Sequence, residues 1–446
     1  MHLDADHHSI CKFESRNDSN YITVKNLLKL WASMLGKSRP KTTKIQETKN
    51  DEIKQLGLAL QTRGSAEADS SVLRIKVLDG TCQWIILREE FINWVESVSS
   101  VTPSIFWLVG QPATGKTALA KTVVTHLKHQ GHDCVYYSFP SGHQLKRTAA
   151  YCLQSIAFQV AQINDEFRKY LCTLVNDSGI QFNSQTQSYT LIWEKVFEGI
   201  LFKLELQKPL YLILDGINEA NSPDFIKCII KMQSLAPIKL FLASRPTKIL
   251  LKPDAFSLKT TFFLREEDTA DDIRAYVHDA ISDAFPDDPE FRADIISQIL
   301  TKASGSFLWV KLALERLEDN WHTKDDVQKV LNEVPEGMEP LYQQMLDKVT
   351  AQSPKTQLMA KRILTWATCC WRPLSVSELQ IALQPEFQGF INLENTIVQI
   401  CGHFISVDNS MVTIVHPTAG SFLLHDRGNS QYINPREGHE HIYNMS

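Results

Sequence analysis

The sequence has few of the features that mark secreted, membrane or nucleic-acid-binding proteins. It contains no run of about 18 apolar residues, the length that spans a bilayer, and its start, MHLDADHHSICKFES, lacks the apolar centre of a signal peptide. The formal net charge of −5 provides no strong positive field for nucleic acid or anionic lipid. We therefore expect a cytoplasmic protein with no nucleic-acid partner and no membrane partner.

The cysteine and histidine patterns argue against disulfides and bound zinc. The nine cysteines are an odd number without a CxxC pair, and Cys369 and Cys370 are adjacent. This pattern indicates reduced, buried thiols rather than a disulfide framework or a zinc site. His7 and His8 lie side by side in a polar stretch, where exposed side chains without a metal are expected.

The composition is that of a globular protein with several domains. Hydrophobic residues make up 43% and charged residues 22% of the 446 residues, which supplies enough apolar surface for packed cores. At roughly 150 residues per domain, this length corresponds to about three domains. No internal repeat or low-complexity tract is present.

Residues 1–70 are predicted to form an N-terminal helical segment and a linker. Apolar side chains recur at helical spacing over residues 21–35, before Gly36. This amphipathic helix either packs on its own protein, docks on an unknown protein partner or contacts a membrane. The polar stretch 41–55 and the linker-like TRGSAEADSS then lead to a boundary near residue 70.

Residues 71–262 are predicted to form an α/β nucleotide-binding domain. Four short apolar runs, SIFWLVG, CVYYSF, PLYLILDG and IKLFLASRP, have the length and composition of buried strands. Helical patterns such as AAYCLQSIAFQVAQI separate them. Because strands alternate with helices, we expect a parallel sheet with helices on both faces.

Two further domains are predicted after the sheet. Residues 263–335 contain three amphipathic helical patterns in succession and are expected to form a helical domain. Residues 336–446 contain more helices, then HFISV, the turn DNS and MVTIV, which indicate a hairpin. Ser375 and Glu378 match a capping box, so a helix is expected to begin just after RPL. Helices followed by a two-stranded hairpin are typical of a winged-helix domain.

The stretch GQPATGKTA matches the phosphate-binding pattern G-x-x-x-x-G-K-[ST] and lies between a strand pattern and a helix pattern. In such a loop the glycines let backbone N–H groups surround the phosphates, the lysine contacts the β- and γ-phosphates, and the hydroxyl holds Mg²⁺. The predicted nucleotide-binding residues are Gly110, Gln111, Pro112, Ala113, Thr114, Gly115, Lys116, Thr117 and Ala118.

Two strand ends downstream carry the remaining candidate catalytic residues. Asp215 ends the apolar run LYLILD and is expected to hold the metal with Thr117, while Glu219 is placed to polarise the attacking water. Arg245 ends FLAS and can reach a γ-phosphate. The alternatives are that Asp215 only caps a helix and that Arg245 is an ordinary surface arginine. About one hundred residues separate Lys116 from Asp215, which is room for two or three βα units.

These motifs, in their order, resemble those of the NACHT family of signal-transducing NTPases with numerous domains (the STAND class), in particular its fungal type. The resemblance covers about four-fifths of the chain. It rests on the following segments: GTCQWIIL, the phosphate loop, LYLILDGINEA, FLASRP, SGSFLWVKLALERL, LNEVPEGMEPLYQQML, WRPLSVSELQIAL and IVHPTAGSFLL.

The resemblance implies a switch operated by ADP and ATP. ADP would hold the three domains closed, and exchange for ATP would open them and permit self-association. It also implies that His416 contacts the β-phosphate of ADP; the alternative is a histidine without a ligand. Where the family usually has two acidic residues, this chain has Asn218 and Glu219, so a slow ATPase is expected. The family's array of sensor repeats does not follow HEHIYNMS in this sequence.

Three other functions are open at this point. A P-loop kinase or helicase-type motor requires an acceptor pocket or further motor motifs, and neither is evident. An origin-recognition-like ATPase requires a basic recognition helix, whereas SVSELQIALQPEF is acidic. A nucleotide-binding scaffold without turnover fits the same motifs as the switch.

Overall fold

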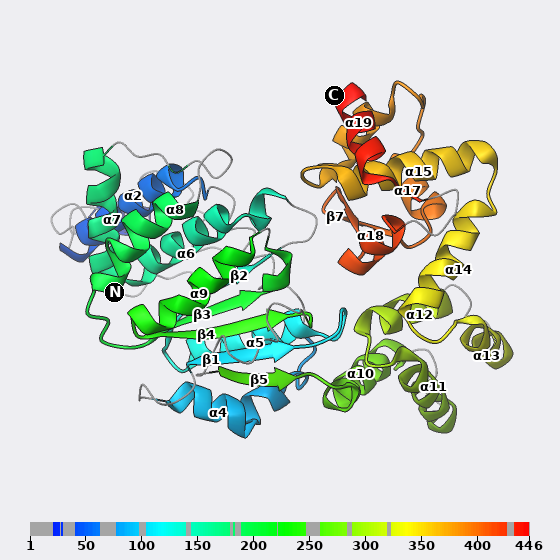
Figure 1. The fold of residues 1–446 in the computed structure, drawn as a ribbon, viewed down its shortest axis with the longest axis horizontal. Helices are drawn as coiled ribbons and strands as arrows, with labels where there is room; N and C mark the ends of the chain where they lie inside the picture. The colour runs from blue at the N-terminus through cyan, green and yellow to red at the C-terminus, as the bar shows by residue number, and fades with distance from the viewer. Residues whose placement is uncertain are drawn as a thin grey trace.

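The computed structural model describes most of the chain. The described residues are 21–26, 28–29, 41–62, 77–97, 104–139, 144–178, 182, 189–220, 222–246, 259–282, 288–318, 323–425 and 432–445. Figure 1 shows the sheet and its helices on one side, and the later helices with the small second sheet on the other.

A five-stranded parallel sheet is the centre of the first part. Its strands are β1 (Ile105–Val109), β2 (Asp133–Ser138), β3 (Leu210–Asp215), β4 (Ile238–Ser244) and β5 (Lys259–Phe263), in the order β2-β3-β4-β1-β5. The four predicted strands and the parallel sheet are confirmed. The edge strand β5, with the sequence KTTFF, was not predicted, because its only apolar residues are two phenylalanines at its end and Phe263 is half exposed.

Helices cover both faces of the sheet, as predicted. Alternate residues of β1 point to opposite sides, so Trp107 packs with one layer of helices and Phe106 with the other. The first layer includes α6 (Ala149–Ile163) and α9 (Pro223–Leu235); the second includes α4 (Glu89–Glu96) and α5 (Lys116–His129). Because both faces are covered, the central strands are mostly apolar. The buried Lys239 of β4 is an exception, and its ammonium donates to the backbone carbonyls of Trp94 and Val95.

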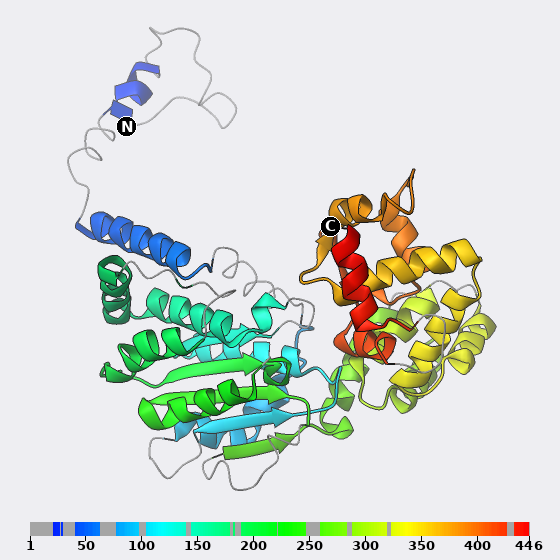
Figure 2. The ribbon, with the colours of Figure 1, turned by 45° about the horizontal axis from the view of Figure 1, so that its top comes forward.

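The polar stretch near the N-terminus belongs to this packed part. Helix α2 (Lys41–Ala59) lies along α6 and α7 (Asp165–Ser178), on the side away from the winged helix (Figure 2). Leu56 and Leu60 are fully buried in the core, and Arg168 forms a 2.8 Å ion pair with Glu52. A packed helix was not predicted here, because the stretch is mostly polar and charged. Ile53 and Leu56 face the core, whereas Leu58 is 47% exposed.

Much of the predicted N-terminal segment lies outside the described residues. Residues 21–26 and 28–29 are helical, and the rest of the predicted helix 21–35 is outside, as are His7, His8 and nearly all of the linker-like stretch.

The segment from Lys116 to Asp215 was expected to have room for two or three βα units. Its described residues contain α5, β2, a long helical stretch and β3, which make two helix–strand units. The stretch between β2 and β3 comprises η2 (Leu145–Arg147), α6, α7, α8 (Tyr189–Ile192), the π-helical turn Trp193–Glu198 and η4 (Leu201–Lys203). The second unit is long because several helices, and no further strand among the described residues, separate β2 from β3.

Helices α10 to α14 follow the sheet. They are α10 (Glu266–Ile281), α11 (Pro289–Ala303), α12 (Phe307–Glu318), α13 (Lys324–Glu333) and α14 (Met338–Thr350). Helix α14 connects them to the winged helix in Figure 1. One continuous apolar core runs from Ile273 in α10 to Ile433 near the C-terminus, so these helices pack with the winged helix as a single body.

The winged helix has the predicted hairpin and capping box. A three-stranded antiparallel sheet, β6 (Leu374–Ser375), β8 (Met411–Ile414) and β7 (Ile405–Asp408), packs with five helices. These are α15 (Pro354–Cys369), α16 (Val376–Leu383), α17 (Leu393–Ile400), α18 (Pro417–Leu423) and α19 (Pro435–Met445). The Ser375 hydroxyl accepts from the Glu378 N–H at 3.2 Å, and Glu378 accepts from the Ser375 N–H at 2.8 Å.

None of the helices in the described residues has both the length and the apolar composition that a membrane span requires. The eight cysteines in the described part of the chain are free, and six of them are buried.

Candidate nucleotide site

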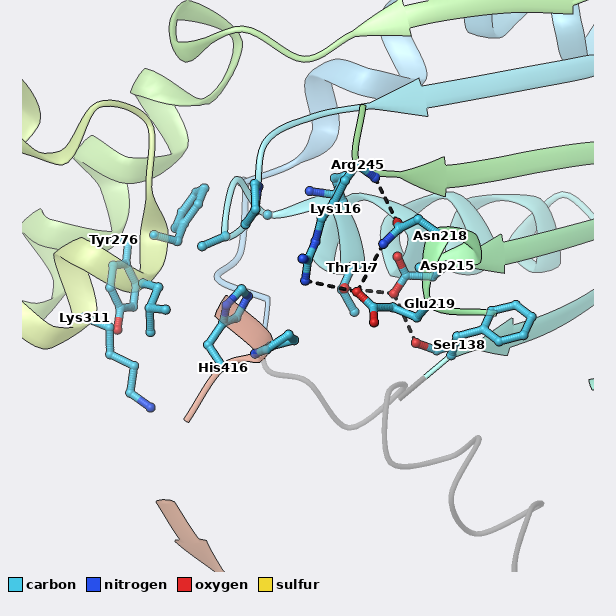
Figure 3. Close-up of a pocket in the computed structure, with 18 residues that line it drawn as sticks. Lys116, Thr117, Ser138, Asp215, Asn218, Glu219, Arg245, Tyr276, Lys311 and His416 are labelled. Carbon is cyan, nitrogen blue, oxygen red and sulfur yellow. Dashed lines mark hydrogen bonds and ion pairs between the residues drawn. The ribbon is translucent and has the colours of Figure 1, made fainter. Parts of the chain in front are cut away.

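A cavity of about 490 Å³ lies at the carboxyl ends of β1, β3 and β4, the edge where parallel sheets bind ligands. Its walls come from the sheet, from α10 and α12, and from the start of α18 in the winged helix (Figure 3). The volume lies within the roughly 300–1,000 Å³ of small-molecule sites.

The loop after β1 is shaped to surround an anion. Gly115 has φ of +86°, and a Cβ there would lie 3.1 Å from the Phe307 ring, so the loop requires glycine at this position. Helix α5 begins at Lys116, so the N–H groups of Lys116, Thr117 and Ala118 have no acceptor within the helix. Free N–H groups at a helix N-terminus favour a phosphate.

The side chains beside this loop fit a nucleotide with a divalent metal. Lys116 Nζ donates to the Gln111 carbonyl at 2.5 Å, and burial lowers the pKa of Lys116 to about 8, with Asp215 opposing this shift and Arg245 adding to it. A partly buried ammonium with one hydrogen-bond acceptor in the described structure is suited to a phosphate oxygen.

The metal-binding candidates supply hard oxygen ligands. Thr117 Oγ1 donates to Asp215 Oδ2 at 2.8 Å, and Ser138 Oγ donates to the same oxygen at 3.2 Å. Burial raises the pKa of Asp215, and the hydrogen bonds from Thr117 and Ser138 together with the charge of Lys116 oppose the rise. Hydroxyl and carboxylate oxygens are the ligands that Mg²⁺ takes. Sequence reasoning missed Ser138, which is paired with Asp215 across the sheet.

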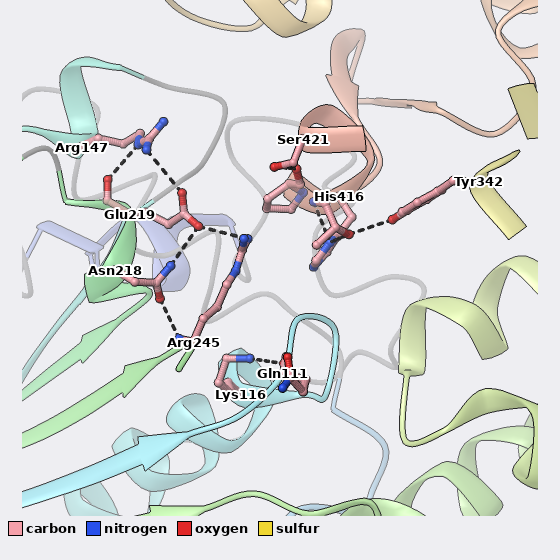
Figure 4. A network of polar contacts seen from close by, with 11 residues as sticks. Gln111, Lys116, Arg147, Asn218, Glu219, Arg245, Tyr342, His416 and Ser421 are labelled. Atoms are coloured by element: carbon pink, nitrogen blue, oxygen red, sulfur yellow. Dashed lines mark hydrogen bonds and ion pairs between the residues drawn. The ribbon is translucent and has the colours of Figure 1, made fainter. Parts of the chain in front are cut away.

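Glu219 is held in a network of polar contacts (Figure 4). It ends the short turn η5 (Ile217–Glu219) after β3. Its Oε1 accepts from Asn218 Nδ2 at 3.1 Å and pairs with Arg245 Nη2 at 3.0 Å, while its Oε2 lies 3.4 Å from Arg147 Nη2. Asn218 Oδ1 also accepts the Arg245 N–H at 2.9 Å. In this arrangement Arg245 pairs with Glu219, and Arg147 joins them from outside the predicted motifs.

His416 reaches the cavity from the winged helix. It caps α18: its Nδ1 accepts from the Thr418 N–H at 3.3 Å and lies 2.7 Å from the Thr418 hydroxyl, which in turn bonds the Tyr342 hydroxyl at 2.8 Å. Burial lowers the pKa of His416 to about 4, with further contributions from Arg245 and Lys116. The neutral ring therefore carries its proton on Nε2, which leaves a donor for an anion.

Helices α10 and α12 supply wall residues that sequence reasoning did not single out. The Phe307 N–H donates to the Ala113 carbonyl of the phosphate loop at 2.9 Å, and Tyr276, Leu308 and Lys311 line the same cavity. The motif SGSFLWVKLALERL contains three of these residues, but its spacing predicts only an amphipathic helix, not a contact with the loop.

The structure brings most of the predicted site residues to this one cavity. It is lined by Pro112, Ala113, Gly115, Lys116, Thr117, Asp215, Glu219, Arg245 and His416. The other four, Gly110, Gln111, Thr114 and Ala118, are not in its lining. Gly110 links the loop to β4 through an N–H bond to the Ser244 carbonyl at 3.1 Å, and Thr114 Oγ1 donates to the Gln111 carbonyl at 2.8 Å, so these residues shape the loop.

Comparison with known proteins adds two family matches and one curated relative. The family described as "Nephrocystin 3, N-terminal" matches residues 80–245, and that described as "GPI inositol-deacylase, winged helix domain" matches residues 346–433. Vegetative incompatibility protein HET-E-1 of Podospora anserina is 24% identical over 369 residues, which are 78% of this chain and 26% of that protein. The chain thus spans about a quarter of that relative's length.

Three solved structures resemble the chain distantly. A Walker-type ATPase of Pyrococcus abyssi has a TM-score of 0.36 at 14% identity and covers 75% of this chain and 94% of its own. A RuvB variant of Thermotoga maritima has a TM-score of 0.33 at 13% identity, covering 77% and 95%. Drosophila ORC bound to DNA has a TM-score of 0.32 at 13% identity, covering 73% and 82%. Scores this low carry no argument about function.

The parallel sheet, the phosphate-binding loop before α5 and the acidic end of β3 define a P-loop NTPase. Together with the two family matches and the fungal relative, they support a NACHT-type NTPase, the family that the sequence resembles.

Proposed function

We propose that the chain is a signalling switch operated by ADP and ATP, in which nucleotide controls whether the winged helix stays docked on the nucleotide-binding domain. The observation that carries the proposal is that His416 of the winged helix lines the same cavity as Lys116 of the phosphate loop. A ligand held by both residues links the two domains directly. Exchange of that ligand then changes how firmly they are joined.

Lys116 and the first N–H groups of α5 bind the phosphates, and Thr117 and Asp215 hold Mg²⁺. Held there, the metal would neutralise part of the charge of the phosphates. Burial removes water from the Lys116 ammonium and lowers its pKa. A phosphate oxygen replaces that water with an anionic hydrogen-bond acceptor. The His416 Nε2–H group donates to a phosphate oxygen of ADP in the closed form.

Glu219 is the group we assign to water activation. It accepts a proton from water as the water oxygen bonds to the γ-phosphorus and the bond to the ADP oxygen breaks. Both of its carboxylate oxygens are engaged by Arg245, Arg147 and Asn218, which supports slow turnover. The same contacts favour the second candidate, a nucleotide-binding scaffold without turnover.

We divide the chain into the N-terminal helical segment and linker (1–70), the nucleotide-binding domain (71–262), the helical domain (263–335) and the winged-helix domain (336–446). The two family matches support the second and fourth of these. Release of the winged helix permits self-association in the ATP state, and the N-terminal helix recruits a protein partner in the cytoplasm.

The test begins with the nucleotide content of the purified chain and its mass by light scattering in ADP and in ATP with Mg²⁺. Nucleotide at about a thousand times its dissociation constant raises the free energy of unfolding by about 4 kcal/mol. Lys116→Ala should remove most of this stabilisation, whereas Lys128→Ala, which changes an exposed lysine in the last turn of the same helix, should not. A wild-type melting curve that is identical with and without nucleotide contradicts the proposal.

A further inference from the structure

Arg147 contacts Glu219 twice from outside the predicted motifs. Its Nε donates to the Glu219 backbone carbonyl at 2.9 Å, and its Nη2 lies 3.4 Å from Glu219 Oε2. Because Arg245 and Asn218 contact the other oxygen, Arg147 determines whether the carboxylate keeps an oxygen free. A general base requires such an oxygen within hydrogen-bond reach of the water.

The short turn that carries Arg147 also contacts the winged helix. At the start of η2 the Gln144 N–H donates to the Trp371 carbonyl, after α15, at 3.0 Å. At its end, Tyr137 donates to the Lys146 carbonyl and the Thr148 side chain caps α6. The turn is therefore attached to the sheet, to α6 and to the winged helix at once. Figure 4 shows the Arg147 side chain pointing toward Glu219, with His416 and Ser421 of the winged helix on the other side of Arg245.

A second cavity, of about 510 Å³, lies between these elements. Arg147, Glu219 and Arg245 line it from the nucleotide-binding domain, and Thr413, Pro417 and Ser421 line it from the winged helix. Glu219 lines both this cavity and the nucleotide cavity, whereas Arg147 lines this cavity alone of the two. The guanidinium of Arg147 therefore has room to withdraw without displacing the phosphate loop.

We propose that Arg147 is a positioning residue that withholds Glu219 from water while the winged helix is docked on η2. When the winged helix leaves, η2 loses its bond to Trp371, Arg147 releases Oε2, and that oxygen accepts the proton of the attacking water. The nucleophile is water, the leaving group is ADP, and Glu219 passes the proton to solvent. This inference rests on the proposed role of Glu219 in hydrolysis.

The first experiment measures steady-state ATP turnover of the full chain. Arg147→Ala should raise turnover by about two- to fivefold, the range that corresponds to one partly exposed ion pair. Lys146→Ala removes the neighbouring charge, which lines the second cavity but not the nucleotide cavity, and should leave turnover at the wild-type value. The gain should disappear in the double variant Arg147→Ala with Glu219→Gln.

A backbone change tests the contact with the winged helix. Gln144 has φ of −56°, which proline adopts, so Gln144→Pro deletes the donor to Trp371 with little change of backbone conformation. Turnover should rise as for Arg147→Ala. Gln144→Ala keeps the N–H group and should behave as wild type.

A third measurement needs no nucleotide. The Glu219 and Ala220 N–H groups bond to the carbonyls of Gly216 and Ile217. Hydrogen exchange at these two amides should be faster in Arg147→Ala, because η5 loses its contact with the guanidinium. Arg147→Lys retains a cation near Oε2 and should give intermediate exchange and intermediate turnover, which also separates the effect from misfolding.

A fall in turnover for Arg147→Ala, or a gain that persists without the Glu219 carboxylate, overturns the inference. If instead Glu219→Gln alone leaves wild-type turnover unchanged, the assignment of Glu219 fails, and with it the hydrolytic part of the proposed function.

Discussion

At the scale of single residues, His416 has two tasks, and each uses a different ring nitrogen. Nδ1 is committed to the N–H of Thr418 at the start of α18, so only Nε2 is available to a ligand. A lysine in this place would add a third cation beside Lys116 and Arg245. Neutral imidazole supplies a donor without that repulsion, and burial keeps it neutral by lowering its pKa to about 4.

Replacing this histidine should accelerate the loss of ADP. A hydrogen bond to a charged acceptor contributes about 1.5–3 kcal/mol, so His416→Ala should raise the ADP dissociation rate by about ten- to a hundredfold. Stopped-flow measurement with a fluorescent ADP analogue gives the rate. His425→Ala, on an exposed side chain just beyond the same helix, is the matched control. Equal rates for wild type and His416→Ala would assign the histidine to capping alone.

The Glu219 carboxylate should limit the rate of hydrolysis. With both oxygens engaged and Asn218 in place of a second acid, wild-type turnover should fall below about 1 s⁻¹, the lower end of typical enzymes. Glu219→Gln should lower it by a further hundredfold or so, the contribution of a general base. A coupled phosphate-release assay measures both values. Fast turnover that is insensitive to this substitution contradicts the assignment.

At the scale of elements, one buried carboxylate of helix α10 binds the nucleotide-binding domain. Asp272 is 7% exposed, and its two oxygens accept from the Cys82 N–H and from Trp84 Nε1, both at 2.9 Å. A second contact, the 2.5 Å ion pair between Arg88 and Asp268, is closer to solvent. The position of α10 therefore depends on Asp272 more than on its surface charges.

Removing that carboxylate should destabilise the protein. Asp272→Ala leaves two donors without their acceptor, which costs about 2–4 kcal/mol in the free energy of unfolding. Asp271→Ala changes the neighbouring, largely exposed carboxylate, whose ion pair with Arg274 contributes under about 1 kcal/mol. Urea denaturation of the three proteins compares them. Similar midpoints for both variants would show that water satisfies the donors that Asp272 now binds.

The elements that the sequence predicts are those whose pattern is local. Buried central strands are nearly continuous apolar runs, and the capping box from Ser375 to Glu378 is a four-residue signal, so both can be predicted from the chain. Strand β5 and helix α2 owe their positions to neighbours far along the chain. An edge strand such as β5 needs fewer apolar residues than a central strand. A helix such as α2, with apolar residues on one face, has a polar average composition.

The same distinction applies to the site. The phosphate loop, Asp215, Glu219 and Arg245 follow strands that the pattern reveals, so their common edge of the sheet follows from topology. Phe307 and Arg147 lie on helical elements with no such marker. Their contacts, with the Ala113 carbonyl and with Glu219, arise only when distant segments pack.

At the scale of the whole molecule, the pKa of His416 makes closure sensitive to acid. In the closed form its pKa is about 4, whereas an exposed histidine has the ordinary value of 6.5. The open form therefore binds the proton more tightly, and closure is favoured above pH 6.5 and weakened as the pH falls from 6.5 towards 4. The charged groups that oppose protonation are Lys116 of α5 and Arg245 after β4.

Acidification of the nucleotide-free chain should consequently favour the open form. At pH 5.5, one unit below the ordinary pKa, the closed-to-open ratio should fall about tenfold. Small-angle scattering across pH 7.5 to 5 measures the radius of gyration. His416→Gln cannot take up this proton and is expected to lose most of the dependence. An equal response in both proteins would place the acid-sensitive group elsewhere.

The bond between the Phe307 N–H and the Ala113 carbonyl joins the phosphate loop to the helix on which the winged helix packs. Thermodynamic linkage makes such a connection reciprocal: whatever factor a bound ligand contributes to docking, docking contributes to the affinity for that ligand. A partner protein that binds the undocked winged helix must then weaken the binding of ADP by a certain factor. ADP must weaken the binding of that partner by the same factor. Two titrations of one equilibrium, performed from opposite ends, should therefore yield the same coupling constant.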